Sequence, residues 1–148
     1  MPTVREALPE ERSEIAAFYL KTGYTAALTD DDRILVAERD QHIVGALRIC
    51  SEGGVAVVRG MRVLEELRRK GIGESLLVAA ADVLGSEACY CFPHAHLESF
   101  YGRIGFRKLL VRRAPGFLQE RWHEYGRRGL DVIIMIREGH EASVLNLD

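Results

Sequence analysis

Two glycines separated by one residue form the most informative chemical feature of this chain. They lie in the stretch Leu67-Arg68-Arg69-Lys70-Gly71-Ile72-Gly73-Glu74, after a β-like run and at the start of an Ala-rich helical run. Glycine lets a backbone approach a ligand closely because it has no Cβ. A helix that begins here offers unpaired N–H groups and the positive end of its dipole. With three cations just before it, the stretch predicts a seat for an anion such as a pyrophosphate.

Other interpretations of the two glycines can be weighed from the residues alone. A Gly-x-Gly pair is also common where a glycine-rich turn simply leads into a helix, with no ligand. The dinucleotide fingerprint G-x-G-x-x-G fails because Leu76 occupies its third position. The Walker A pattern fails too, since no Gly-Lys-Ser/Thr follows a spaced glycine.

A second motif, Phe100-Tyr101-Gly102-Arg103-Ile104-Gly105-Phe106, follows about 30 residues downstream. With it, the chain resembles the GNAT family of N-acetyltransferases. In that family a strand is followed by Gln/Arg-x-x-Gly-x-Gly/Ala at a helix start, matched here by Arg68 to Gly73. A later helix then carries Phe-Tyr-x-x-x-Gly-Phe. The resemblance spans roughly residues 3–137, although its specificity rests on about 30 residues.

The resemblance implies both a fold and a reaction. The fold is α/β (α+β), with a mixed, mostly antiparallel central sheet that is flanked by helices and splayed between its central strands. The reaction is transfer of the acetyl group of acetyl-CoA to an amine, by direct attack in a ternary complex. A main-chain N–H near Met61 would stabilise the oxyanion. The expected cofactor-binding residues are Arg68, Arg69, Lys70, Gly71, Ile72, Gly73 and Glu74 around the pyrophosphate, and Met61, Arg62, Val63 and His94 along the pantetheine arm.

Tyr101 falls on the position that is often the general acid of the family. A phenol with a pKa of about 10 can pass a proton to a CoA thiolate, whose conjugate thiol has a pKa of roughly 8.5. The competing interpretation is a core residue on the stripe formed with Leu97, Phe100 and Ile104. His94 stands where the family often has Asn. Its imidazole either replaces one hydrogen bond of that amide or belongs to a loop without ligand contact.

The general base is the least defined part of the predicted site. Many family members use a glutamate on the central strand, but the predicted strand at 55–63 contains no acid. Glu65 and Glu66 follow that strand, where a solvated turn is the favoured interpretation over a base. Glu52 and His96 are further candidates. The absent glutamate keeps an alternative function open, a non-catalytic acyl-CoA-binding sensor or regulatory module, which the presence of Tyr101 disfavours.

Cysteine and histidine also invite a zinc interpretation. Cys89-x-Cys91-x-x-His94-x-His96 contains residue types that bind zinc. Both cysteines lie on a predicted buried strand and no second cluster matches, so we expect packing and no metal. Three cysteines are a low and odd number, which argues against a disulfide framework and favours a reducing, cytoplasmic location.

Length and charge limit the remaining classes. The 148 residues suit one domain, 1–148, with a core at 3–137 and a tail at 138–148 that is expected to fray. A net charge of −2 gives no basic field to attract nucleic acid or a membrane surface. No apolar run approaches the roughly 18 residues of a membrane span, and the acidic start does not resemble a secretion signal.

The pattern of apolar residues predicts alternating strands and helices. Strands are expected at 4–8, 33–38, 43–50, 55–63, 88–92, 106–111 and 131–136, with a hairpin turn at Asp40-Gln41. Helices are expected after Pro9, from the glycine motif to Leu84, and at 97–104 and 117–128.

The acceptor is expected to be a small-molecule amine or a peptide or protein amine. Its pocket would use Phe18, Tyr19 and Tyr24 of the first helix and loop, and Phe117, Trp122 and Tyr125 of the late segment. The same aromatic residues could instead be core. The segment at 116–128 is expected to cover the acceptor site or to make a homodimer contact.

Overall fold

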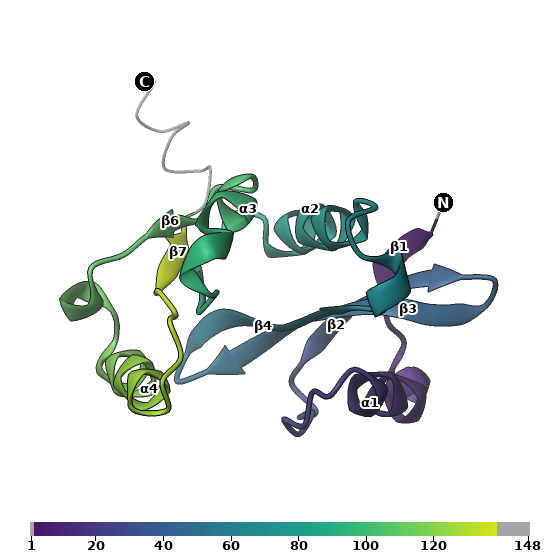
Figure 1. Ribbon diagram of the computed structural model, residues 1–148, viewed down its shortest axis with the longest axis horizontal. Helices are drawn as coiled ribbons and strands as arrows, with labels where there is room; N and C mark the ends of the chain where they lie inside the picture. Colours follow the sequence, from purple (N-terminus) through teal and green to yellow (C-terminus); the bar gives the residue numbers. More distant parts are fainter. Residues whose placement is uncertain (1, 139–148) are drawn as a thin grey trace. The chain divides into compact units, whose positions relative to one another are not determined.

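The computed structural model of the chain describes residues 2–138 (Figure 1). These residues divide into two compact units, one with residues 2–51 and 58–83 and the other with 52–57 and 84–138. The interpretation of 1–148 as a single domain stays a prediction, and the expected tail lies outside the described residues apart from Glu138. None of the helices within 2–138 combines the length and the apolar character needed to cross a membrane.

The first unit contains four strands and two α-helices. They are β1 (Thr3–Glu6), α1 (Arg12–Lys21), β2 (Arg33–Arg39), β3 (His42–Glu52), the greater part of β4 (Val55–Val63) and α2 (Ile72–Leu84). Short 3-10 turns precede each helix, η1 (Pro9–Glu11) and η2 (Glu65–Leu67). Helices α1 and α2 cover opposite faces of these strands (Figure 1).

Strand pairing in the first unit follows the predicted hairpin. β1 and β3 each pair antiparallel with β2, in registers that place Val4 opposite Ala37 and Leu35 opposite Leu47. Asp40 and Gln41 join β2 to β3 with φ values of 52° and 66°. Positive φ at both central residues is the geometry of the type I′ turn that matches strand twist, so the expected hairpin is confirmed.

Both faces of this part of the sheet are packed with apolar side chains. On one face Ile15, Phe18 and Tyr19 of α1 pack with residues of β2 and β3. On the other, Leu76, Leu77 and Ala80 of α2 are completely buried. A Cβ at Gly45 would lie 3.2 Å from side-chain atoms of both Ile72 and Leu76. Glycine at this position of β3 therefore lets the first turns of α2 lie close to the sheet.

The second unit is built from shorter elements. They are β5 (Cys89–Cys91), η3 (Ala95–Leu97), α3 (Glu98–Gly102), β6 (Arg107–Lys108), η4 (Val111–Arg113), α4 (Gly116–Arg127) and β7 (Met135–Arg137). β7 pairs antiparallel with both β5 and β6. Val57 of β4, Leu118 of α4 and Ile134 belong to one core cluster of this unit.

The sheet order among the described residues is β1-β2-β3-β4-β5-β7-β6. A seven-stranded, mostly antiparallel sheet with flanking helices confirms the predicted α/β fold class. The two last strands differ most from expectation: 106–111 contains only the two residues of β6, and the final strand begins at Met135. The residues before Met135 make isolated bonds instead, such as Ile133 N–H to the Pro93 carbonyl at 3.0 Å.

Candidate functional site

The glycine motif connects η2 to α2 in the first unit, as the sequence predicted. The backbone turns sharply here, with Arg69 at φ 65° and Gly71 at φ 86°. The first bond of helical type runs from Ser75 N–H to the Gly71 carbonyl, at 3.0 Å. The amides of Ile72 and Gly73 precede it and have no acceptor within the helix. The segment therefore presents amides at a helix start, which is the geometry that binds an anionic oxygen.

Gly71 is required by its backbone conformation rather than by crowding. A Cβ built on it would meet nothing within 4 Å, so the space beside it is open. The buried side chains of Leu67 and Ile72 hold the two ends of the turn, while Arg68, Arg69 and Lys70 are exposed between them. This arrangement leaves room for a ligand against the backbone.

We predict that Gly71→Ala weakens acetyl-CoA binding at least about tenfold. A Cβ at this φ strains the backbone of the turn and fills part of the open space beside it. Gly85→Ala is the matched control, since Gly85 also has a positive φ of 55° and open space around its Cβ position. Both variants are expected to lose about 1–2 kcal/mol of stability. Calorimetric titration with acetyl-CoA separates them, and equal binding by the two variants would contradict the role of the glycine motif.

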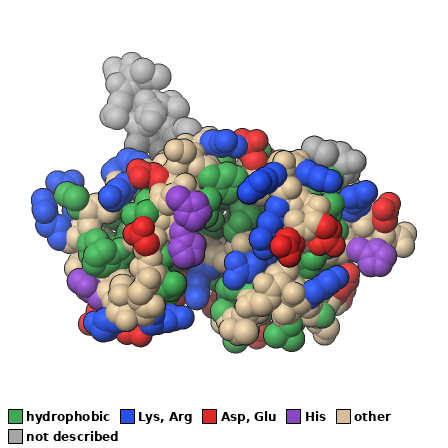
Figure 2. All heavy atoms as spheres, viewed as in Figure 1, with side chains coloured by type: hydrophobic (Ala, Val, Ile, Leu, Met, Phe, Trp, Pro, Cys, Tyr) green, Lys and Arg blue, Asp and Glu red, His purple; other side chains and the backbone are tan. Residues whose placement is uncertain are grey.

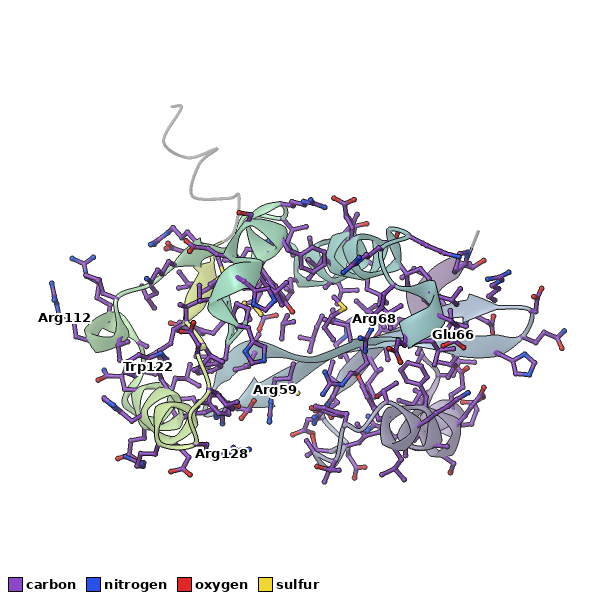
Figure 3. All side chains as sticks on the ribbon, in the orientation of Figure 1. Arg59, Glu66, Arg68, Arg112, Trp122 and Arg128 are labelled. Carbon is purple, nitrogen blue, oxygen red and sulfur yellow. The ribbon has the colours of Figure 1, made fainter. Side chains whose placement is uncertain are left out.

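Positive charge gathers at the same segment. Figure 2 shows Lys and Arg side chains, with some acidic ones, over the stretch between β4 and α2. Figure 3 marks Arg68 and Glu66 there. Arg68 uses Nε to donate to the Val63 carbonyl at 3.3 Å. Lys70 lines a cleft of about 250 Å³ together with Leu67, Ile72 and residues of the β1 and β2 ends. The cations can thus reach an anion held at the helix start.

The end of β4 carries the residues predicted to lie along the pantetheine arm. Met61, Arg62 and Val63 are half-buried and belong to the same unit as the glycine motif. Just before them, Gly60 has a φ of 66°, which interrupts the extended strand. A Cβ at Gly60 would come within 3.1 Å of Arg48 and Tyr24 and 3.0 Å of the Tyr19 hydroxyl. Glycine is therefore needed here for both conformation and packing.

A buried polar network that the sequence did not reveal surrounds this bend. The Arg48 guanidinium donates to Asp32 Oδ2 through Nε at 2.9 Å and Nη2 at 2.7 Å, and to the Tyr24 hydroxyl at 2.6 Å. The Tyr19 hydroxyl donates to the Gly60 carbonyl at 2.8 Å. Arg48 and Asp32 are both at least 98% buried as side chains. The network fixes the loop after α1 against β3 and β4.

Charge states in the network follow from this pairing. Burial by itself would raise the pKa of Asp32, but hydrogen bonds from the Thr29 amide and from Arg48 outweigh it and lower the net pKa. Burial raises the pKa of the Tyr19 phenol and raises that of the Cys50 thiol to about 12. Tyr19 and Cys50 are therefore neutral at physiological pH, whereas Asp32 and Arg48 form an ion pair.

Tyr101 and His94 belong to the second unit, whereas the glycine motif belongs to the first. Tyr101 is 7% exposed on α3, and its ring makes edge contacts with Phe100 and Phe106 at centroid distances of 5.3 and 6.1 Å. His94 is exposed at the start of η3 and stacks on His96 with ring centroids 6.0 Å apart. Their proposed roles stay predictions.

The candidate bases lie in different settings. Glu65 and Glu66 are exposed on η2, and His96 is exposed on η3. Glu52 is in the second unit and forms an ion pair with Arg121 of α4 at 2.5 Å, with both side chains mostly buried. Because the Glu52 carboxylate is already engaged by Arg121, this contact disfavours Glu52 for the role.

The residues of the zinc pattern divide by exposure. Cys89 and Cys91 are buried on β5, while His94 and His96 are exposed. Within 2–138 no three His, Cys, Asp or Glu side chains gather as a metal site would require. All three cysteines are buried thiols, and burial raises the pKa of Cys91 well above its ordinary value. That thiol is accordingly inert at neutral pH.

The aromatic residues expected around the acceptor belong to both units, some to the first and some to the second. Phe18 and Tyr19 are core residues of the first unit, whereas Tyr24 is half-buried and lines a cleft of about 450 Å³ with Tyr19, residues of α1 and the loop 25–28. In the second unit, the Trp122 indole donates to the Val132 carbonyl at 2.9 Å. Figure 3 marks Trp122 on α4. Its indole N–H therefore already has a structural partner.

Comparison with known proteins gives a family and a fold. The model of the acetyltransferase (GNAT) domain matches residues 30–108, more than half of the chain. The sequence matches none of the curated proteins with which it was compared.

Several solved structures are similar in fold. The ribosomal-protein-S18-alanine N-acetyltransferase of Escherichia coli has a TM-score of 0.67 at 14% identity, covering 93% of this chain and 94% of its own. An acyl-CoA N-acyltransferase of Pseudomonas aeruginosa has a TM-score of 0.64 at 20% identity, covering 93% and 98%.

N-acetylglutamate synthase of Neisseria gonorrhoeae, complexed with coenzyme A and N-acetyl-glutamate, has a TM-score of 0.67 at 16% identity. The match covers 95% of this chain but only 35% of the synthase chain. The present chain thus corresponds to about a third of that enzyme. At these identities the likeness concerns the fold.

Proposed function

Because the chain belongs to the GNAT acetyltransferase family, we propose that it transfers the acetyl group of acetyl-CoA to an amine. The single observation that carries the proposal is the glycine motif at the start of α2. There a left-handed Gly71 with open space beside it precedes amides without helical acceptors, and three exposed cations adjoin them. These are the groups that a pyrophosphate requires.

The reaction is proposed as one direct displacement. The neutral amine nitrogen attacks the thioester carbonyl carbon, and a main-chain N–H near Met61 stabilises the oxyanion. The C–S bond then breaks, and the sulfur takes a proton from the Tyr101 hydroxyl. The attacking nitrogen loses its extra proton to a base or to water, and solvent returns a proton to the Tyr101 phenolate. The roles of Tyr101, His94 and Met61 rest on the motif match and on family resemblance.

The acceptor class is proposed from the relatives. One of them carries the name of an enzyme that acetylates an alanine of a ribosomal protein, and another was solved with N-acetyl-glutamate. We accordingly propose an amino acid, another small amine, or a peptide or protein amine. Three buried thiols suit a reducing compartment, which supports the proposed cytoplasmic location.

Thermal unfolding with and without acetyl-CoA tests cofactor binding first. Ligand at about 100 times its dissociation constant adds roughly 2.7 kcal/mol to the free energy of unfolding. For a chain of this length the melting temperature is expected to rise by about 5–10 °C. No rise at millimolar acetyl-CoA would mean that the glycine motif does not bind this substrate.

Release of CoA thiol then separates an enzyme from a binding module. A screen of amines with acetyl-CoA is expected to give thiol release that depends on the amine and a matching amount of acetylated product. The alternative is an acyl-CoA sensor, favoured by the absence of acids from β4 and by the ion pair that holds Glu52. A thermal shift without amine-dependent release across the screen would favour the sensor.

A further inference from the structure

Arg62 at the end of β4 is a cation without an anionic partner among residues 2–138. Its guanidinium carbon lies 5.3 Å from the centroid of the Tyr24 ring. Its Nε is buried and has no hydrogen-bond partner, and no ion pair of Arg62 occurs within residues 2–138. A buried donor that has lost water without gaining an acceptor is costly. Such a group in a native protein calls for an explanation, and a ligand is one.

Arg48 provides an internal comparison, because it lies near the same ring. Its guanidinium carbon is 5.8 Å from the Tyr24 centroid, but its charge is neutralised by Asp32 at 2.7 Å. Arg48 also donates to the Tyr24 hydroxyl and thereby orients the ring. The ring therefore contacts two guanidinium groups. Arg48 has a carboxylate partner, whereas Arg62 has none in the described part of the chain. The local charge at Arg62 remains positive.

The chemistry of this arrangement favours a carboxylate. A guanidinium is a planar fork that matches a carboxylate with two parallel hydrogen bonds. In the proposed function the phosphate oxygens of CoA already have a binding site, at the amides and cations of the glycine motif, and do not need Arg62. Tyr24 also lines the cleft of about 450 Å³ bordered by α1 and the loop 25–28, so a group bound beside this ring has adjacent space for a side chain.

We propose that the Arg62 side chain binds a carboxylate of the acceptor, so that the acceptor is an amino acid or a peptide with a carboxylate close to the acetylated amine. This inference rests on the proposed function. Tyr24 acts as a positioning residue, because Arg48 and Asp32 fix its ring and the ring supports the Arg62 guanidinium. The main chain of 61–63 remains assigned to the acyl-CoA, and only the side chain of Arg62 serves the acceptor.

The test compares standard amino acids with their carboxamides, which keep the α-amine and lose the negative charge. For the wild-type protein, kcat/KM is expected to be about 10–100 times higher for the carboxylate than for the carboxamide of the best substrate. Arg62→Gln is expected to abolish that preference, and Arg62→Lys to restore part of it through charge alone. Arg33→Gln, at an exposed ion pair with Glu6, is the matched control that keeps the preference.

An unchanged carboxylate preference in Arg62→Gln would overturn the proposal. If the KM for acetyl-CoA also rises about tenfold in this variant, the side chain serves the cofactor instead.

A binding measurement keeps the proposal testable if no amine is acetylated. Calorimetric titration uses N-acetyl amino acids and N-acetyl amino acid amides, with acetyl-CoA titrated in parallel. Selective binding of the acids by wild type, lost in Arg62→Gln, supports the carboxylate site even where turnover fails. Failure of acetyl-CoA to bind refutes the proposed function separately. Absence of binding by every acid at millimolar concentration refutes the role of Arg62.

Discussion

Replacing Tyr101 with phenylalanine is expected to lower kcat about a hundredfold and to leave the KM for acetyl-CoA within about threefold. The reason is that the hydroxyl would act only when the C–S bond breaks and the sulfur gains negative charge. The ring itself should stay in place, since its edge contacts with Phe100 and Phe106 need no hydroxyl. Steady-state kinetics with the best amine acceptor measures both constants.

Tyr90→Phe is the matched control for this substitution. Tyr90 is a half-buried tyrosine of the same unit, on β5, where it packs against the core that contains Leu118 and Ile134. Removing its hydroxyl should leave kcat within about threefold. If Tyr101→Phe behaves like this control, Tyr101 is structural and the proton must come from water or another group. A loss of folded protein in Tyr101→Phe would be visible as a lower melting temperature.

Features that depend on local signals could be predicted from the sequence. The turn at Asp40-Gln41 lies between two apolar runs, and a two-residue connection admits few backbone geometries. The start of α2 at Ile72 follows from glycine, cations and an apolar stripe within a few residues. The two family motifs are equally local, so the sequence alone predicts the fold class and the candidate acyl-CoA site.

Features that depend on distant residues could not be predicted. Arg48 lies within the apolar run 43–50, which signals that it needs a partner, but no spacing rule identifies Asp32 as that partner. Likewise, the apolar residues of 106–111 predict a strand, yet Leu109 donates its N–H to the Ile134 carbonyl at 2.9 Å and the chain then turns into η4. The sequence predicts a role for Arg62 only through its backbone position, and the role proposed for its side chain depends on packing against Tyr24.

The second large effect is expected from Asp32→Asn, which should destabilise the protein by about 3–5 kcal/mol. The substitution keeps the shape of the side chain but leaves the Arg48 guanidinium as a buried charge without a counterion. Asp32 also accepts hydrogen bonds from the amide and hydroxyl of Thr29, at 3.0 and 2.9 Å, so the loop before β2 should loosen as well. Urea unfolding measures the change in free energy. Thermal unfolding should show a fall in melting temperature on the order of 10 °C.

Two controls distinguish the buried charge from a simple loss of contacts. Glu124→Gln removes an exposed partner of Arg127 and should cost less than about 1 kcal/mol. The double variant Asp32→Leu with Arg48→Met removes both charges and should be more stable than Asp32→Asn, because no isolated guanidinium remains. A double variant as unstable as the single one would show that the contacts, and not the charge, carry the stability.

Acid pH should reproduce part of the effect in the wild-type protein. The pKa of Asp32 is lowered in the folded state, so the ionised form stabilises the fold above the unfolded pKa of about 3.9, and this contribution is lost as the pH falls through the lower folded value. Glu11 behaves in the same direction, because its hydrogen bonds with Arg5 and the Leu8 amide lower its pKa to about 2. The pKa of Glu6 is lowered as well by its hydrogen bonds with Arg33, so the contributions of Glu11 and Glu6 remain in Asp32→Asn. The free energy of unfolding should therefore fall less steeply between about pH 4 and pH 2 than in wild type. Parallel pH profiles would mean that folding does not lower the pKa of Asp32.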